Sequence, residues 1–151
     1  FCSLAQHGEK GEPVHPERGN LRTPDEQASF SRGLRQVNIP YANQSVEVWM
    51  MQWVPEAEPR KYMMRGWPFF EQAVAGLIKD AAQLLLILPE SQRCQDWQEL
   101  YRAAVGGRRP PLTPAQFNEE IDFKTFTSPG TDKALVIKKY KETFHDVLGY
   151  A

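Results

Sequence analysis

The sequence has few of the residues that mark a disulfide framework, a metal site or a membrane span. Its two cysteines, Cys2 and Cys94, are too few and too far apart for either kind of site, and they favour a reducing compartment, the cytoplasm. The longest apolar run, residues 84–89, is far too short to cross a bilayer. The net charge of −1 gives no field that would attract nucleic acid or an anionic membrane. We therefore expect no metal, no nucleic-acid partner and no membrane association.

The short motifs of the common catalytic sites are also missing. There is no glycine-rich phosphate loop, no G-x-S-x-G elbow, no H-E-x-x-H and no C-x-x-C. His7 and His15 lie in a polar stretch, residues 5–22, and His145 lies near the end of the chain. No cysteine or glutamate stands at ligand spacing from the loop histidines, so we expect neither a metal pair nor a hydrolytic triad. Glu71, considered below, is the one acidic residue in a setting that suggests chemistry.

The sequence does contain a clear start of a helix. The 151 residues suit one domain. Thr23, Pro24 and Glu26 form a capping box with proline at the first helical position. The spacing predicts a helix that ends near Asn38, because Pro40 follows. Its expected buried face is Phe30, Leu34, Val37 and Tyr41, with Arg32 and Arg35 outside it on a solvated side.

Two stretches that favour strands flank a second helix. Residues 45–52 are β-branched and aromatic and predict a mostly buried strand. Residues 84–88 are a continuous apolar run, typical of a strand buried on both faces in a parallel sheet. The helix between them is predicted from Pro68 to Lys79. The fold class is therefore α/β: a partial doubly wound parallel sheet with flanking helices, whose ligands bind at the carboxyl ends of the strands.

The last third is mostly helical. Helices are predicted over residues 96–105, from Thr113 onward and from Asp132 onward. Their expected inward residues are Phe117, Ile121, Ile137, Tyr140, Phe144 and Leu148. A lysine cluster on the last helix is interpreted as its solvated face: Lys138, Lys139 and Lys141. We expect an α/β core over residues 1–90 and a helical extension over residues 91–151 packed on it.

The chain opens on an apolar stretch. Residues 1–4 are typical of the end of a strand, and the chain begins at Phe1 rather than at methionine. We expect a copy of an α/β domain whose first strand precedes Phe1. The alternative is a frayed N-terminus on a complete domain.

Glu71 follows a strand and a loop, close to the start of the second helix. At 100° per residue it lies at the edge of the apolar face, beside a cleft rather than in bulk water. A carboxylate there can bind a ribose hydroxyl or stabilise the oxocarbenium ion that forms when an N-glycosidic bond breaks. The alternative is structural, because an acid in the first turn is stabilised by the helix dipole. Trp67, Phe69 and Phe70 are equally compatible with a core.

Residues 62–71 resemble a known signature. Arg65, Trp67 and Glu71 reproduce the R-x-W-x-x-x-E pattern of heterokaryon-incompatibility (HET) domains, with Tyr62 ahead of it. The same Trp-to-Glu spacing is found in Toll/interleukin-1 receptor (TIR) domains as W-C-x-x-E.

Two further stretches resemble HET domains in the same order. Residues 1–6, with Ser3 and Gln6, resemble the D-x-C/S-x-x-Q strand end of that family. Residues 26–41 resemble the helix that follows it. The resemblance covers residues 1–88.

This resemblance implies a TIR-like, flavodoxin-type domain used in signalling or defence through protein–protein assembly or self-association. In enzymatic TIR members the glutamate is the catalytic residue of NAD cleavage, a role that would fall on Glu71. NAD would be a substrate, and no cofactor is implied. Pro68 stands where the family has cysteine. The remaining motif residues would bind ligand or support the site: Trp67, Arg65, Tyr62, Ser3 and Gln6.

Overall fold

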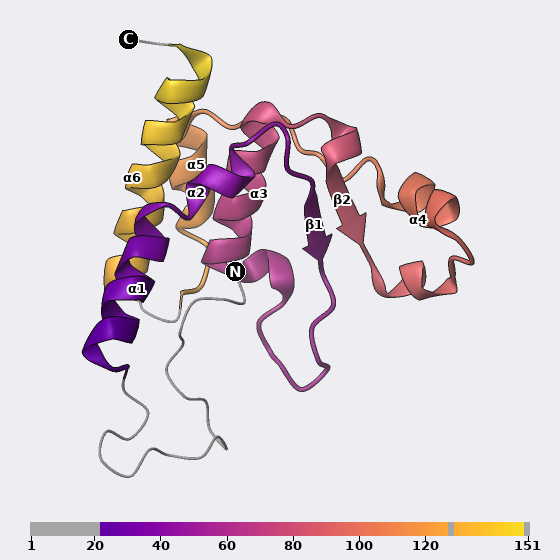
Figure 1. The fold of residues 1–151 in the computed structure, drawn as a ribbon, viewed down its shortest axis with the longest axis horizontal. Coiled ribbons are helices and arrows are strands. Elements are labelled where there is room, and N and C mark those ends of the chain that lie inside the picture. The colour runs from indigo at the N-terminus through magenta and orange to yellow at the C-terminus, as the bar shows by residue number, and fades with distance from the viewer. Residues whose placement is uncertain (1–21, 127–128, 150–151) are drawn as a thin grey trace. The chain divides into compact units, whose positions relative to one another are not determined.

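The computed structural model describes residues 22–126 and 129–149 (Figure 1). The chain divides into two compact units, Phe1–Val37 and Asn38–Ala151. The predicted strand end at residues 1–4 lies outside the described residues, and so do the candidate site residues Ser3 and Gln6.

The first helix begins as its capping box predicts. Helix α1 spans Pro24–Arg35, and the Glu26 N–H donates to Thr23 Oγ1 at 3.2 Å while the Thr23 N–H donates to Glu26 Oε2 at 2.7 Å. The predicted end near Asn38 was wrong, because α1 ends at Arg35. The predicted buried face was also wrong within α1, where no residue is buried.

Pro40 lies within a helix instead of stopping one. A four-residue helix, α2, spans Asn38–Tyr41 in the second unit. The N–H groups of a helix's first turn have no partner within the helix, so proline loses no hydrogen bond there. Pro40 is therefore compatible with the helix that the sequence predicted it to end.

The two predicted strands pair in parallel. Strand β1 spans Val48–Met51 and strand β2 spans Leu84–Ile87, with Val48 opposite Leu84 and Met51 opposite Ile87. Helix α3 connects them and makes the strand–helix–strand unit that the pattern predicted. The α/β class is confirmed as a mixture of helices with two parallel strands.

The two strands differ in burial. In β2, Leu84 and Leu85 are both buried, so its first half is covered on both faces, as predicted. In β1 only Val48 and Met50 are buried, and the alternate residues between and after them are exposed. The prediction of a mostly buried strand was therefore wrong for one of its two faces.

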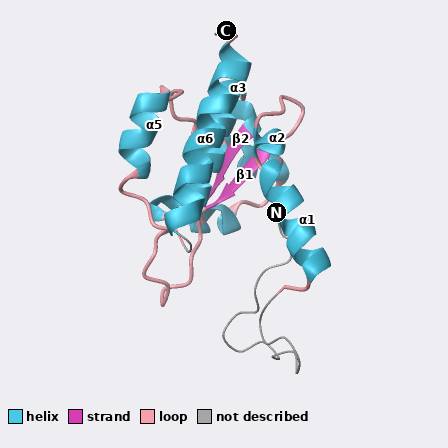
Figure 2. Ribbon diagram, turned by 90° about the vertical axis from the view of Figure 1, so that its left-hand side faces the viewer, coloured by secondary structure: helices cyan, strands magenta, loops and turns pink. Residues whose placement is uncertain are grey.

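Helix α3 spans Gly66–Ile78, beginning two residues before the predicted Pro68, and it packs on two sides. On one side Ala75 joins Val48, Met50 and Leu84 in a buried cluster. On the other side lie α5 (Pro114–Ile121) and α6 (Pro129–Leu148), which come from the predicted C-terminal extension. Figures 1 and 2 show α3 between the strands and α6.

An aromatic stack joins the three helices. Phe69 of α3 stacks on Phe117 of α5 with ring centroids 5.3 Å apart, and Phe117 stacks on Tyr140 of α6 at 4.0 Å. All three rings are buried. Their burial and stacking fix α5 and α6 against α3. The division into a core of residues 1–90 and an extension of residues 91–151 stays a prediction.

Two lysines are buried by this packing. Lys79, just after α3, donates to the carbonyl oxygens of Asn43 and Val46, and burial lowers the pKa of its ammonium group. Lys139 of α6 donates to Asn38 Oδ1 at 3.2 Å. The prediction of a solvated lysine face was therefore wrong for Lys139, although Lys138 is exposed.

Helix α4 covers part of the other side of the sheet. It spans Trp97–Ala104 within the predicted residues 96–105, has Asp96 as its N-cap, and contacts β2 on the side away from α3 (Figure 1). The remaining short 3₁₀ helices are Tyr62–Met64, Ala81–Gln83 and Pro89–Arg93. Among the helices of residues 22–126 and 129–149, none is long and apolar enough to cross a membrane.

The start of α3 is closed by a segment from beyond α5. The Gly66 N–H donates to the Thr125 carbonyl at 2.8 Å, and the Thr125 N–H donates to the Met64 carbonyl at 2.9 Å. A Cβ on Gly66 would lie 2.0 Å from Phe126 Cζ, which is inside van der Waals contact. Gly66 is therefore the residue that allows the Phe126 ring to rest on the helix start.

We expect Gly66→Ala to destabilise the protein by about 1–3 kcal/mol, because the new methyl group overlaps the Phe126 ring. In a Phe126→Ala background the same change should cost much less, because the ring is gone. Urea unfolding of the wild type, both single variants and the double variant measures this coupling. If the two substitutions change the free energy of unfolding additively, the proposed overlap between residue 66 and the Phe126 ring is contradicted.

Candidate functional site

The motif of residues 62–71 is spread over two elements. Tyr62 begins a 3₁₀ helix, Arg65 is the N-cap of α3, and Trp67 and Glu71 lie within α3. Because α3 follows β1 and returns to the start of β2, its N-terminal end belongs to the carboxyl-end side of the strands. This is the side on which the sequence predicted a ligand site.

Glu71 lies among tyrosines. The Tyr41 hydroxyl of α2 donates a hydrogen bond to the Glu71 carboxyl group. Tyr62 is close enough for the charge of Glu71 to raise the pKa of its hydroxyl. Burial raises the pKa of Glu71 to about 7, against the lowering effect of the Tyr41 hydrogen bond. Burial, followed by the nearby Glu71, raises the pKa of Tyr62 to about 12 and that of Tyr41 further still. A carboxyl group that titrates near neutral pH can act as an acid or a base.

The helix-dipole explanation for Glu71 does not fit. Since α3 begins at Gly66, Glu71 lies beyond the first turn, and that turn holds no acidic residue. The dipole acts within the first turn and favours the charged form, whereas burial here favours the neutral form. The predicted placement of Glu71 in the first turn was wrong because the helix begins earlier than Pro68.

Arg65 contacts the loop that precedes α3. Its Nε donates to the Arg60 carbonyl at 3.2 Å, and its Nη2 lies 3.9 Å from Glu58 Oε1. These contacts hold the loop before α3. Among the described residues Arg65 therefore supports the loop.

Trp67 has a structural contact. Its Nε1 donates to Asp132 Oδ2 at 3.1 Å, which joins the start of α3 to α6, and its ring meets the edge of Phe70 at 6.0 Å. Phe69 and Phe70 are buried. The core interpretation is therefore correct for Phe69 and Phe70, whereas Trp67 is half-buried and joins the start of α3 to α6.

The N-terminus of α3 is occupied. The Gly66 N–H, which could otherwise bind a phosphate, is bonded to Thr125, and Phe126 lies over it. The Gly66 N–H is therefore not available to an anion in this structure.

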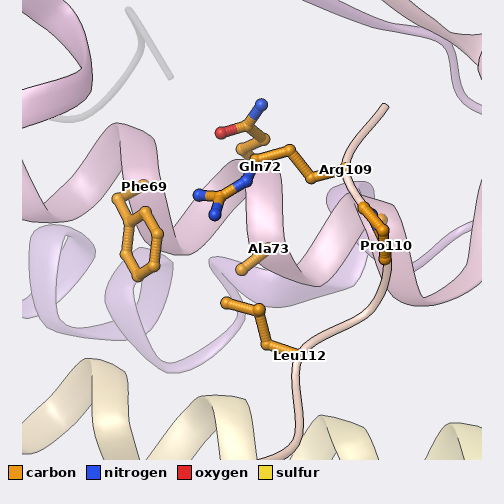
Figure 3. Close-up of a pocket in the computed structure, with 7 residues that line it drawn as sticks. Phe69, Gln72, Ala73, Arg109, Pro110 and Leu112 are labelled. Carbon is orange, nitrogen blue, oxygen red and sulfur yellow. The ribbon is translucent and has the colours of Figure 1, made fainter. Parts of the chain in front are cut away.

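A small cavity lies along another face of α3 (Figure 3). Its volume of about 10 Å³ holds roughly one water molecule. Gln72 lines it, and the buried Gln72 Oε1 has no hydrogen-bond partner among the described residues. Arg109, also in the lining, pairs with Glu120 at 3.0 Å. The cavity is too small for a nucleotide, and none of the predicted site residues lines it.

Sequence reasoning missed a surface on the sheet. Residues 49, 51 and 53 alternate along and beyond β1, so they point away from α3. Trp97 of α4 stacks on Trp49 with ring centroids 5.5 Å apart. We call the following four exposed side chains the aromatic face: Trp49 (49% exposed), Met51 (65%), Trp53 (65%) and Trp97 (50%). Its signal in the sequence is this period-two alternation of large apolar residues.

Comparisons with known proteins give no relative. No protein-family model matches the chain, and neither the curated proteins nor the solved structures contain a match. The resemblance to TIR and HET domains therefore stays a prediction. Among residues 22–126 and 129–149, no group of three or more histidine, cysteine, aspartate or glutamate side chains could hold a metal ion.

The pKa of Glu71 predicts how stability depends on pH. Because its folded-state pKa of about 7 lies above the ordinary 4.5, the folded protein binds the proton more tightly than the unfolded chain. The resulting stabilisation is complete below the ordinary value and is lost as pH rises through about 7. We expect the free energy of unfolding to fall by roughly 2–3 kcal/mol between about pH 5 and about pH 8.

Urea unfolding at both pH values tests this. Glu71→Gln should remove most of the fall, because the amide does not titrate, whereas Glu119→Gln, at an exposed position of α5, should leave it unchanged. An equal fall in the wild type and in Glu71→Gln would show that Glu71 is not the titrating group.

Proposed function

We propose that this chain is a protein-interaction domain of signalling or defence type, which acts by assembly through its aromatic face. The observation that carries the proposal is the exposure of Trp49, Met51, Trp53 and Trp97. Large apolar side chains exposed together on one side of a sheet mark interaction sites, since their exposure to water is unfavourable by roughly 25 cal/mol per Å². Tryptophan and methionine are also enriched in protein interfaces.

The sheet supports the finer fold that the sequence predicted. Among the described residues β1 pairs only with β2. Parallel sheets are commonly larger than two strands and covered on both faces. We therefore infer a partial doubly wound sheet of TIR or HET type, since that fold has further strands beside a pair such as β1 and β2. The signalling or defence role comes from the resemblance of residues 1–88 to those families.

The start of α3 favours assembly over catalysis. In an α/β enzyme a ligand would meet this helix end, but here Thr125 and Phe126 cover it. Trp67 is bonded to Asp132. The motif residues are thus used to hold the fold together, while the aromatic face is open.

Photo-crosslinking in the protein's native cells tests the proposal. A photoreactive phenylalanine analogue in place of Trp53 should give covalent adducts with protein, because Trp53 is exposed on the aromatic face. The same analogue in place of Lys141, exposed on α6, is the control and should give few adducts. Equal yields at the two positions, or none at Trp53, would rule out assembly through this face.

The second candidate is cleavage of NAD, with Glu71 as the catalytic carboxylate. The observation in its favour is the buried carboxyl group, bonded to Tyr41 and titrating at about pH 7. In this function the Glu71 carboxylate would bind the ribose or stabilise its positive charge while water replaces nicotinamide.

Nicotinamide release from NAD by the purified chain tests this second candidate. If Glu71 is catalytic, Glu71→Gln should lower the rate by about a hundredfold or more, and Glu119→Gln should leave it unchanged. The absence of release, or equal release from the wild type and Glu71→Gln, would exclude the enzyme.

A further inference from the structure

The small cavity beside Gln72 lies between α3 and the segment that leads into α5 (Figure 3). Gln72 and Gly76 are four residues apart on α3, so they share the helix face that borders it. The wall across from them comes from the residues between α4 and α5. These wall residues are Arg109, Pro110 and Leu112.

Gln72 brings a buried polar atom without a partner to this cavity. Its side chain belongs to a residue that is 7% exposed, and its Oε1 atom accepts no hydrogen bond from any described residue. A buried amide oxygen is unfavourable unless it is hydrogen-bonded. The facing segment has few donors to offer, because Pro110 and Pro111 carry no N–H group. A donor from solvent would satisfy this oxygen.

Arg109 supplies two further polar groups at the same place. A Cβ on Gly76 would lie 3.5 Å from the Arg109 carbonyl oxygen, so this oxygen faces α3 about one turn from Gln72. The Arg109 carbonyl accepts no hydrogen bond from the described residues. Arg109 Nη1 and Nη2 both donate to Glu120 at 3.0 Å, which leaves the Nε–H group for another acceptor.

We propose that this cavity is a binding site for one ordered water molecule, which joins Gln72 of α3 to the Arg109 carbonyl. The volume of about 10 Å³ matches the space that one water needs. The water donates one hydrogen to Gln72 Oε1 and the other to the Arg109 carbonyl oxygen, and it accepts from the Arg109 Nε–H group. About three such bonds are typical of a buried water.

The charges around the cavity favour a neutral ligand over an ion. Arg108 Nη2 donates to the Gly76 carbonyl at 3.0 Å, and Arg109 lines the cavity itself. These two guanidinium groups disfavour a bound cation, while the Gln72 and Arg109 oxygens disfavour an anion. Water is both a donor and an acceptor, so it suits this mixture of groups.

The bound water holds the segment before α5 on α3. Two direct hydrogen bonds hold the same segment: Arg108 donates to the Gly76 carbonyl, and the Tyr140 hydroxyl donates to the Leu112 carbonyl at 2.7 Å. The water adds a third attachment between these two, at Arg109. It thereby uses the polar groups that the prolines of the segment leave without a partner.

Oxygen-17 magnetic relaxation dispersion of the purified full chain tests the proposal, because it counts water molecules that stay bound for longer than the protein takes to tumble. We expect Gln72→Leu to hold about one long-lived water fewer than the wild type, because leucine accepts no hydrogen bond. Gly76→Ala should lose the same water, because its methyl group faces the Arg109 carbonyl and takes up the space. The matched control is Gln98→Leu, at an exposed position of α4, which should keep the wild-type count.

Three results would overturn the proposal. The first is an equal count in the wild type and Gln72→Leu, and the second is an equal loss in Gln72→Leu and Gln98→Leu. The third is a water that Gly76→Ala retains, because such a water would not lie between Gln72 and Arg109. Thermal unfolding checks that each variant is folded, and Gln72→Met replaces Gln72→Leu if the leucine variant does not fold.

Discussion

The packing of α3 on both of its sides is the constraint on which the rest of this structure depends. One side buries Ala75 against the two strands, and the other buries Phe69 against Phe117 and Tyr140. The Tyr140 hydroxyl donates to the Leu112 carbonyl at 2.7 Å, so the stack also holds the segment that leads into α5. Among the described residues, α3 lies on one side of the sheet with α5 and α6 behind it, and α4 lies on the other side, where the aromatic face is exposed.

The same packing explains the contacts made by the motif around Trp67. Gly66 has no side chain, so the Phe126 ring closes over the helix start, and Trp67 reaches Asp132 of α6. Glu71 is separate from this arrangement. Its carboxyl group is bonded to Tyr41 and has a raised pKa, which suits it to acid–base chemistry. Neither of the described cavities is lined by Glu71. The proposed interaction function rests on the exposed aromatic face, and the enzymatic alternative depends on this one carboxyl group.

Local chemistry could be predicted from the sequence, whereas long-range pairing could not. The starts of α1 and α5 could be predicted from Thr23 and Thr113, because a capping box involves only neighbouring residues. Lys139 was misplaced on a solvated face because its partner, Asn38, is far away in the chain. Glu71 was correctly placed at the edge of an apolar face, but its partner Tyr41 was predicted only as a core residue. The exposed side of β1 was missed because nothing local shows which strand face a helix will cover.

The central claim is the proposal that this chain binds protein through its aromatic face. The most direct measurement is fluorine NMR of protein labelled with fluorotryptophan, because the four tryptophans divide into three on the face and Trp67 within the fold. The account predicts that the signals of Trp49, Trp53 and Trp97 shift or broaden when the labelled protein is placed in an extract of its native cells, while that of Trp67 does not. Four signals that are unchanged by the extract, or a change at Trp67 alone, would contradict it.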